Sequence, residues 1–213
     1  MDVTRTEEEQ LEALKEWWVK NGAPIIIGLV IGLGSVFGWR AWQTYQVKQA
    51  EAASDVYTKL IVDVRGNDND KARDAANKIM SDYPHTGYVT YAALLLAKID
   101  VDNDKLDDAT KHLQLALDKA DNVEMKHLAR LRLARVQLAN KQPEQALATL
   151  DVSDMGKFVA TYQELKGDIY AYMNKPEQAK DAYLLALSEQ NDKSGRNNTF
   201  LQMKIDNIGL LKQ

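Results

Sequence analysis

Cysteine is absent from this chain of 213 residues. Its absence excludes disulfide bonds, thiolate nucleophiles and cysteine metal sites, and it fits any cellular compartment. An excess of basic charge is missing too, because residues 43–213 carry 23 basic residues against 25 acidic ones. Nucleic-acid-binding domains usually present a basic surface, so we expect no nucleic acid among the partners.

The usual signatures of catalysis and metal binding are also missing. The sequence has no phosphate-binding glycine loop and no G-x-S-x-G motif, and its acidic run at 100–108 lacks the spacing and the glycine of a calcium loop. The histidines, His85, His112 and His127, form no H-x-x-x-H pair. We therefore expect no catalytic residue, no cofactor and no metal. An envelope enzyme would need convergent carboxylates in a closed pocket, which nothing in the sequence indicates.

One long apolar run contrasts with the polar remainder of the chain. Residues 21–39 read NGAPIIIGLVIGLGSVFGW, nineteen residues without a charge. As a helix they would span roughly 28 Å, close to the ~30 Å hydrocarbon core of a bilayer. A buried core helix would usually be shorter or amphipathic. A signal peptide would start with basic residues, but residues 1–22 hold six acidic residues and three basic ones.

The tryptophans favour an uncleaved transmembrane helix. All four flank the apolar run, at the levels where the two membrane interfaces would lie: Trp17, Trp18, Trp39 and Trp42. We expect an amphipathic leader at 1–22, with a helix from about 6 to 20 opened by Thr6, then a membrane helix at 23–42 and a separate domain at 43–213. The orientation stays open, because three basic residues stand on either side: Arg5, Lys15 and Lys20 before the run, and Arg40, Lys48 and Lys59 after it.

Glycines in the apolar run are spaced for helix packing. Gly28 and Gly32 form one G-x-x-x-G pair, and Gly34 and Gly38 form another. Such pairs let a second membrane helix approach closely, so we predict helix–helix association through these four residues. The alternative is that membrane helices simply tolerate glycine.

Internal repeats predict the fold of the remaining chain. Strand-like alternation is scarce, and long stretches are rich in Ala, Leu, Lys, Glu and Gln, which favours an all-α class. The motif PEQA occurs at 143–146 and again at 176–179, and Ala134 and Leu150 pair with Gly167 and Tyr183 at the same offset of 33. A period near 34 with small residues in both helices is typical of tetratricopeptide-like repeats.

The expected array contains about three to four helix pairs and a C-terminal capping helix. The membrane helix continues as a stalk into the first repeat and breaks at 65–70. Later helices are expected at about 71–82, 88–101, 106–119, 124–140, 143–150, 158–173 and 177–189, followed by a break at 191–198 and a cap at about 199–211.

The repeat register also predicts a candidate partner groove. First helices of such pairs line the concave face, where these proteins usually bind polypeptides. The residues expected there are Tyr91, Leu94, Lys98, Leu131, Arg135, Glu164 and Asp168. Several of them could instead pack against neighbouring helices. Cations in the middle repeats and acids in the last one would suit varied extended polypeptides.

Motifs spread over the whole chain resemble the YfgM family of Gram-negative bacteria. They are NG at 21–22, GWRAW at 38–42, QVKQA at 46–50, RLRLARVQLANKQPEQAL at 130–147 and MKIDNI at 203–208. The resemblance implies a single-pass inner-membrane protein with its leader in the cytoplasm and its repeats in the periplasm. It implies an ancillary, non-enzymatic subunit of the SecYEG translocon that associates with the periplasmic chaperone PpiD. Such a subunit helps pass secretory proteins to periplasmic chaperones. The alternative is a membrane-anchored adaptor or regulator whose repeats bind cytoplasmic partners.

Overall fold

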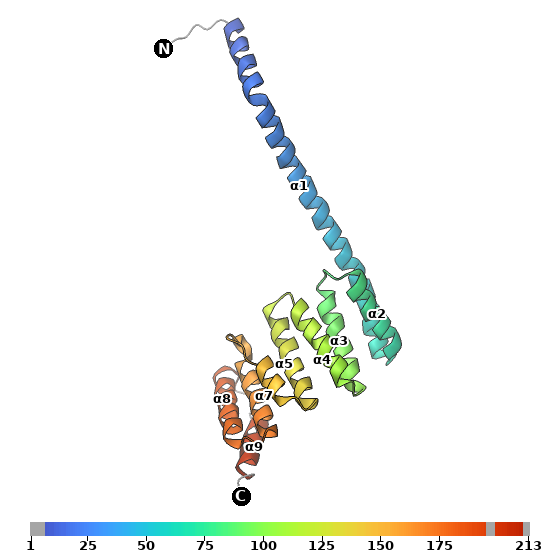
Figure 1. Ribbon diagram of the computed structural model, residues 1–213, viewed down its shortest axis with the longest axis vertical. Helices are drawn as coiled ribbons and strands as arrows, with labels where there is room; N and C mark the ends of the chain where they lie inside the picture. Colours follow the sequence, from blue (N-terminus) through green and yellow to red (C-terminus); the bar gives the residue numbers. More distant parts are fainter. Residues whose placement is uncertain (1–6, 195–198, 211–213) are drawn as a thin grey trace. The chain divides into compact units, whose positions relative to one another are not determined.

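Every described element of the protein is helical, as the sequence predicts. The computed structural model describes residues 7–194 and 199–210 and divides into two compact units, Met1–Gln49 and Ala50–Gln213 (Figure 1). The elements are α1 (Glu7–Arg65), α2 (Asn69–Asp82), α3 (Tyr88–Asp102), α4 (Leu106–Lys119), α5 (Val123–Ala139), α6 (Pro143–Thr149), a 3₁₀ turn η1 (Gly156–Phe158), α7 (Val159–Tyr172), α8 (Pro176–Ser194) and α9 (Thr199–Leu210).

The described residues of the first unit belong to α1, a helix of 59 residues that is long and apolar enough to cross a membrane. The structure corrects one expected boundary, because the leader helix does not end near residue 20 but continues through Gly22 and Pro24. The ring of Trp18 packs on Gly22, where a Cβ would lie 3.1 Å from it. The expected cap Thr6 lies outside the described residues. The four tryptophans and most of the apolar run are exposed, which is not the burial of a soluble core helix.

The second unit contains four helix pairs and a cap. The end of α1 pairs with α2, α3 with α4, α5 with α6 and α7 with α8, while α9 packs on α8 (Figure 1). The predicted break at 191–198 is partly wrong, because α8 continues to Ser194; residues 195–198 lie outside the described part. The predicted cap agrees with α9, except for residue 211, which is not described.

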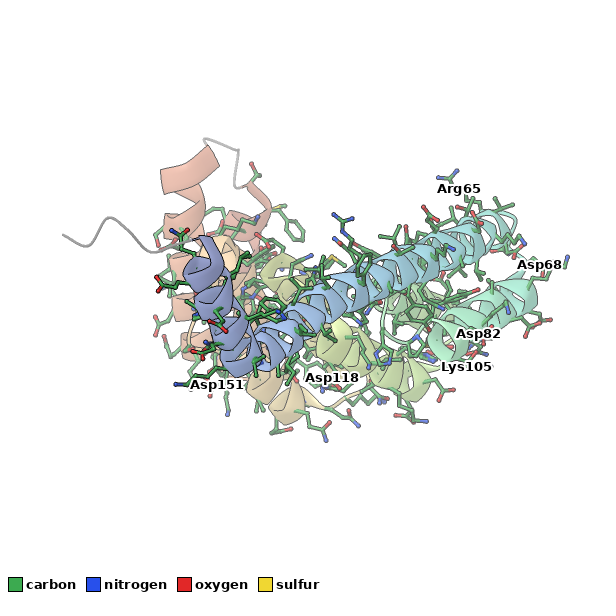
Figure 2. The ribbon with its side chains drawn as sticks, turned by 90° about the horizontal axis from the view of Figure 1, so that it is seen from above. Arg65, Asp68, Asp82, Lys105, Asp118 and Asp151 are labelled. Atoms are coloured by element: carbon green, nitrogen blue, oxygen red, sulfur yellow. The ribbon has the colours of Figure 1, made fainter. Side chains whose placement is uncertain are left out.

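Each pair turns from its first helix to its second in the same way. One residue per turn adopts a left-handed backbone conformation, with φ between 56° and 60°: Asn67, Asp104, Lys141 and Asn174. The next residue donates its backbone N–H five residues back, as in a Schellman motif. These bonds measure 2.8–2.9 Å and join Asp68 to Asp63, Lys105 to Asp100, Gln142 to Gln137 and Lys175 to Tyr170. Figure 2 shows Arg65 and Asp68 on either side of the first of these turns.

Small residues lie where the paired helices cross. Gly167 shows how closely they approach, because a Cβ at this position would lie 2.4 Å from the ring of Tyr183 in the partner helix. Fully buried alanines occupy the corresponding positions of the second helices, namely Ala72, Ala109, Ala146 and Ala179. The repeat pattern read from the sequence is therefore the pattern of helix contacts.

A buried carboxylate joins three helices of the first two repeats. Asp100 in α3 is 0% exposed and pairs with Arg73 of α2, and its Oδ2 lies 2.6 Å from Nδ1 of His112 in α4. Gln137 occupies the equivalent position in the third repeat, where its Oε1 accepts a 2.7 Å hydrogen bond from Thr149. In both repeats a polar pair replaces the aromatic residue that the fourth repeat has at Tyr170.

We predict that Asp100→Asn destabilises the repeat unit by about 3 kcal/mol, because it leaves the partly buried Arg73 without its counter-charge. Urea unfolding of the full-length protein in detergent, followed by circular dichroism, measures the loss. Asp102→Asn is the control, since its exposed carboxylate pairs with Lys98 and should cost less than about 1 kcal/mol. Equal losses in the two variants would show that the Asp100 cluster does not stabilise the array.

Candidate partner groove

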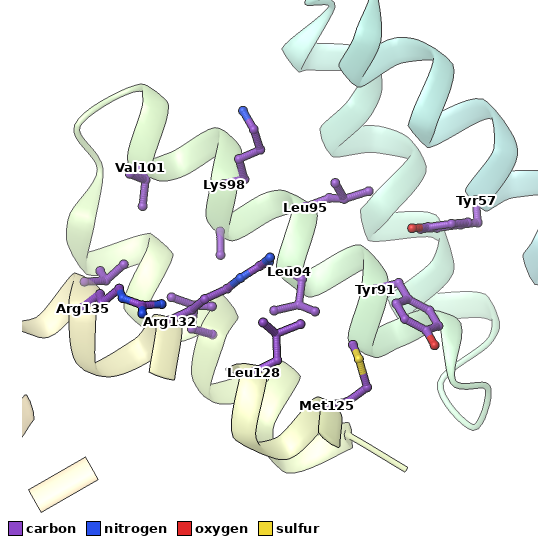
Figure 3. Close-up of a pocket in the computed structure, with 13 residues that line it drawn as sticks. Tyr57, Tyr91, Leu94, Leu95, Lys98, Val101, Met125, Leu128, Arg132 and Arg135 are labelled. Carbon is purple, nitrogen blue, oxygen red and sulfur yellow. The ribbon is translucent and has the colours of Figure 1, made fainter. Parts of the chain in front are cut away.

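A groove of about 710 Å³ lies on the first three repeats. Its walls come mainly from the first helices of those pairs, α1, α3 and α5, and Leu113 of α4 also lies in the lining (Figure 3). The lining residues are Tyr57, Tyr91, Leu94, Leu95, Ala97, Lys98, Val101, Leu113, Met125, Leu128, Arg132, Arg135 and Val136. Apolar side chains dominate this set, so the groove offers mainly hydrophobic contact.

The two ends of the groove differ in chemistry. Figure 3 shows Leu94 and Leu128 facing each other in the middle, with Tyr91 toward one end and Arg135 at the other. Leu94 is held in place because it belongs to the core that joins α3, α4 and α5. The groove therefore has a fixed apolar centre between an aromatic end and a cationic end.

Three tyrosines form the aromatic end. The ring centroid of Tyr57 lies 5.4 Å from that of Tyr88 and 5.9 Å from that of Tyr91. Burial, with the neighbouring Tyr91 and Tyr88, raises the pKa of Tyr57, so its phenol stays neutral. Tyr91 is 39% exposed and offers a ring face to a ligand. Rings at these distances suit packing against aromatic, proline or aliphatic side chains.

The structure places four of the seven predicted groove residues in the lining: Tyr91, Leu94, Lys98 and Arg135. Leu131 is not there, because it is only 3% exposed and packs with Tyr162 and Leu165 in the core between α5 and α7. Its assignment as a contact residue is therefore corrected.

The two acidic residues predicted for the groove in the fourth repeat, Glu164 and Asp168, form ion pairs with Lys204. Nζ of Lys204 in α9 lies 2.8 Å from Oε1 of Glu164 and 2.7 Å from Oδ1 of Asp168. Tyr183 also donates a 2.7 Å hydrogen bond to Asp168. Burial would lower the pKa of Lys204, but its bonds to Asp168 and Glu164 outweigh burial and raise it, so the ammonium stays charged.

Sequence reasoning missed several lining residues, although a signal was available for two of them. Tyr57 precedes Leu94 by the same 37 residues that separate Leu94 from Leu131, so the register includes it. Arg132 lies three residues before Arg135 and thus on the same helix face. Met125 and Leu128 gave no comparable signal, because apolar residues on a helix that packs on both sides do not indicate which side they face.

The histidines occupy three different environments and do not converge. His85 is exposed, His112 pairs with Asp100, and Nδ1 of His127 shares a 2.9 Å hydrogen bond with the hydroxyl of Tyr162. Within residues 7–194 and 199–210, no group of three His, Asp or Glu side chains could hold a metal ion. Burial lowers the pKa of His127, and Arg130 lowers it further, against the opposing effects of Asp154 and Glu124.

We predict that His127 makes the repeat unit less stable in mild acid. Its pKa in the folded state lies below the value of about 6.5 in the unfolded chain, so the unfolded chain binds the proton first as pH falls. The stabilisation is present above about pH 6.5 and is lost below it. Urea unfolding between about pH 7.5 and about pH 5.5 should show a smaller loss in His127→Gln than in the wild type. His85→Gln, at an exposed position, should retain the wild-type slope; a matching slope in His127→Gln would contradict the prediction.

In α1 the glycine positions are open. A Cβ added at Gly28, Gly32, Gly34 or Gly38 would meet nothing within 4 Å. Their packing role stays a prediction, because no second helix is present to test it.

Known proteins and a family model match this chain over nearly its full length. A family model described as a tetratricopeptide repeat-like domain matches residues 15–210. The ancillary SecYEG translocon subunit of Escherichia coli (strain K12) is 31% identical over 99% of this chain and 100% of the relative. The subunits of that name from Haemophilus influenzae and Neisseria gonorrhoeae are 31% and 28% identical, over 95% of this chain and 97% of each relative. This chain belongs to the ancillary SecYEG translocon subunit family.

Membership in this family confirms the resemblance drawn from GWRAW and the other short motifs. The family match begins at residue 15 and therefore includes the apolar run as well as the repeats. The apolar helix and the helical array thus belong to the same family match.

Proposed function

We propose that this protein is a non-enzymatic, membrane-tethered ancillary subunit of the SecYEG translocon. The observation that supports the proposal best is the similarity over nearly the full length to relatives that bear this name. The exposed apolar run of α1, flanked by tryptophans, supports an anchor in the inner membrane. In this proposal the leader is cytoplasmic and the repeats are periplasmic.

The proposed mechanism is a high local concentration of binding surface beside the translocon. The groove on α1, α3 and α5 receives a segment of a partner, either the chaperone PpiD or a secretory chain that has just emerged. Tethering turns the second of two linked binding events into an intramolecular one, so even weak groove binding becomes effective. The chain then passes to periplasmic chaperones.

We expect photo-crosslinking in cells to identify both partners and topology. Photo-reactive residues at Gly32, in the apolar run, and at Arg135, in the groove, should capture translocon subunits and periplasmic chaperones or secretory chains, respectively. Mass spectrometry of the adducts identifies them. Asp118 in α4 lies outside the groove lining and is the matched control, which should capture far less of the groove partners. Cytoplasmic proteins at Arg135 would instead support the adaptor with inverted topology.

We further expect Gly28→Leu/Gly32→Leu to reduce co-purification with membrane partners several-fold, because the added side chains prevent close helix approach. Membrane insertion should be unaffected, since both substitutions keep the run apolar. Ile26→Leu/Phe37→Leu is the matched control, because it introduces two leucines on the helix face opposite Gly28 and Gly32. Quantitative immunoblots of detergent extracts provide the measurement. Co-purification equal to that of the control would remove the glycine face as a contact.

A further inference from the structure

The charge of the groove differs from that of the array as a whole. Its lining contains three cations, Lys98, Arg132 and Arg135, and not one carboxylate. Lys98 already pairs with Asp102 one turn further along α3. In the described part of the chain, neither arginine has a carboxylate within salt-bridge distance. Both arginines are exposed, so their guanidinium groups are accessible to a ligand.

The fourth repeat does not offset this positive charge. Its acids, Glu164 and Asp168, are the residues that would make the surface mixed in sign, but Lys204 of α9 binds both. Lys204 thus offsets one of the two negative charges and contacts both carboxylates, which lie outside the groove lining. The suitability for varied polypeptides stays a prediction, while the charged residues of the groove lining itself are all cations.

Apolar contact and positive charge lie side by side in the groove. Figure 3 shows the side chain of Arg132 extending toward Leu94, close to the apolar centre formed with Leu128. A ligand on Leu94 and Leu128 therefore lies within reach of a guanidinium group. Guanidinium groups bind carboxylates with two parallel hydrogen bonds, which gives selectivity for acidic side chains.

We propose that the groove binds polypeptide segments in which a bulky apolar side chain stands beside an Asp or Glu. The apolar side chain packs on Leu94 and Leu128, with the tyrosines at one end, and the carboxylate binds Arg132 or Arg135. This specificity rests on the proposed role in handling polypeptides. A fatty acid has related chemistry, but the exposed Tyr91 and Val101 leave the groove open, whereas a lipid tail needs an enclosed cavity.

Fluorescence anisotropy on the full-length protein in nanodiscs tests the proposal. The probe is a labelled peptide, blocked at both ends, that carries Leu–Glu pairs among glycines and serines. Matched peptides carry Leu–Gln or Leu–Lys pairs. We expect the Leu–Glu peptide to bind about tenfold more tightly than the Leu–Gln peptide, the ratio expected for one charge-assisted contact, and the Leu–Lys peptide to bind least. Equal binding of all three peptides would overturn the proposal.

Substitutions in the groove test which residues contact the peptide. Arg132→Gln/Arg135→Gln should weaken binding of the Leu–Glu peptide about tenfold and leave the Leu–Gln peptide unchanged, while Tyr91→Ala should weaken both. Lys126→Gln/Arg130→Gln removes the same charge from positions of α5 outside the groove lining and should change neither. Circular dichroism confirms folding. Equal effects of the two double variants, or displacement of the peptide by laurate, would contradict the proposal. The assay needs no translocon, so its outcome is independent of the crosslinking result.

Discussion

Close approach of paired helices is the constraint on which the repeat unit depends. Where two helices cross, the side chain must be small, and Gly167 marks the limit because even a Cβ would overlap the ring of Tyr183. Fully buried alanines meet the same requirement elsewhere. Helices this close need a short reversal, which the left-handed residue of each turn provides. The first helices are thereby stacked side by side, and the groove lies on three of them.

This constraint explains why so much of the fold could be predicted from the sequence. A position that accepts only Ala or Gly repeats visibly, so the offset of 33 between Ala134 and Gly167 identified the helix pairs. Turn residues such as Asn and Asp located the boundaries within a few positions. The leader boundary failed because Gly22 and Pro24 are usual helix breakers, whereas α1 continues through both. Local propensity is a weak guide in long apolar helices, where glycine and proline are tolerated.

The groove was predicted only in part, because a register gives the face of a helix and not what covers it. Leu131 has the register position of Leu94, yet Tyr162 and Leu165 of the next pair bury it. Lys204 reaches Asp168 from 36 residues along the chain, a distance that no repeat period encodes. Long-range contacts of this kind bury Leu131 in the core and pair Asp168 outside the groove lining. Packing between repeats, rather than the repeat period itself, therefore determines which residues line the groove.

The proposed membrane anchor in α1 would make weak ligand binding in the groove effective. Tyr57, the first groove residue, follows Trp42 by fifteen residues, which is at most about 50 Å even for a fully extended chain. In the proposed role such a tether raises the effective concentration of the groove for a chain that emerges beside it. Even weak binding in an open groove would then give useful occupancy, and a weakly bound ligand is released quickly. The proposed handing of a chain onward requires fast release, whereas a deep, enclosed site would retain the chain.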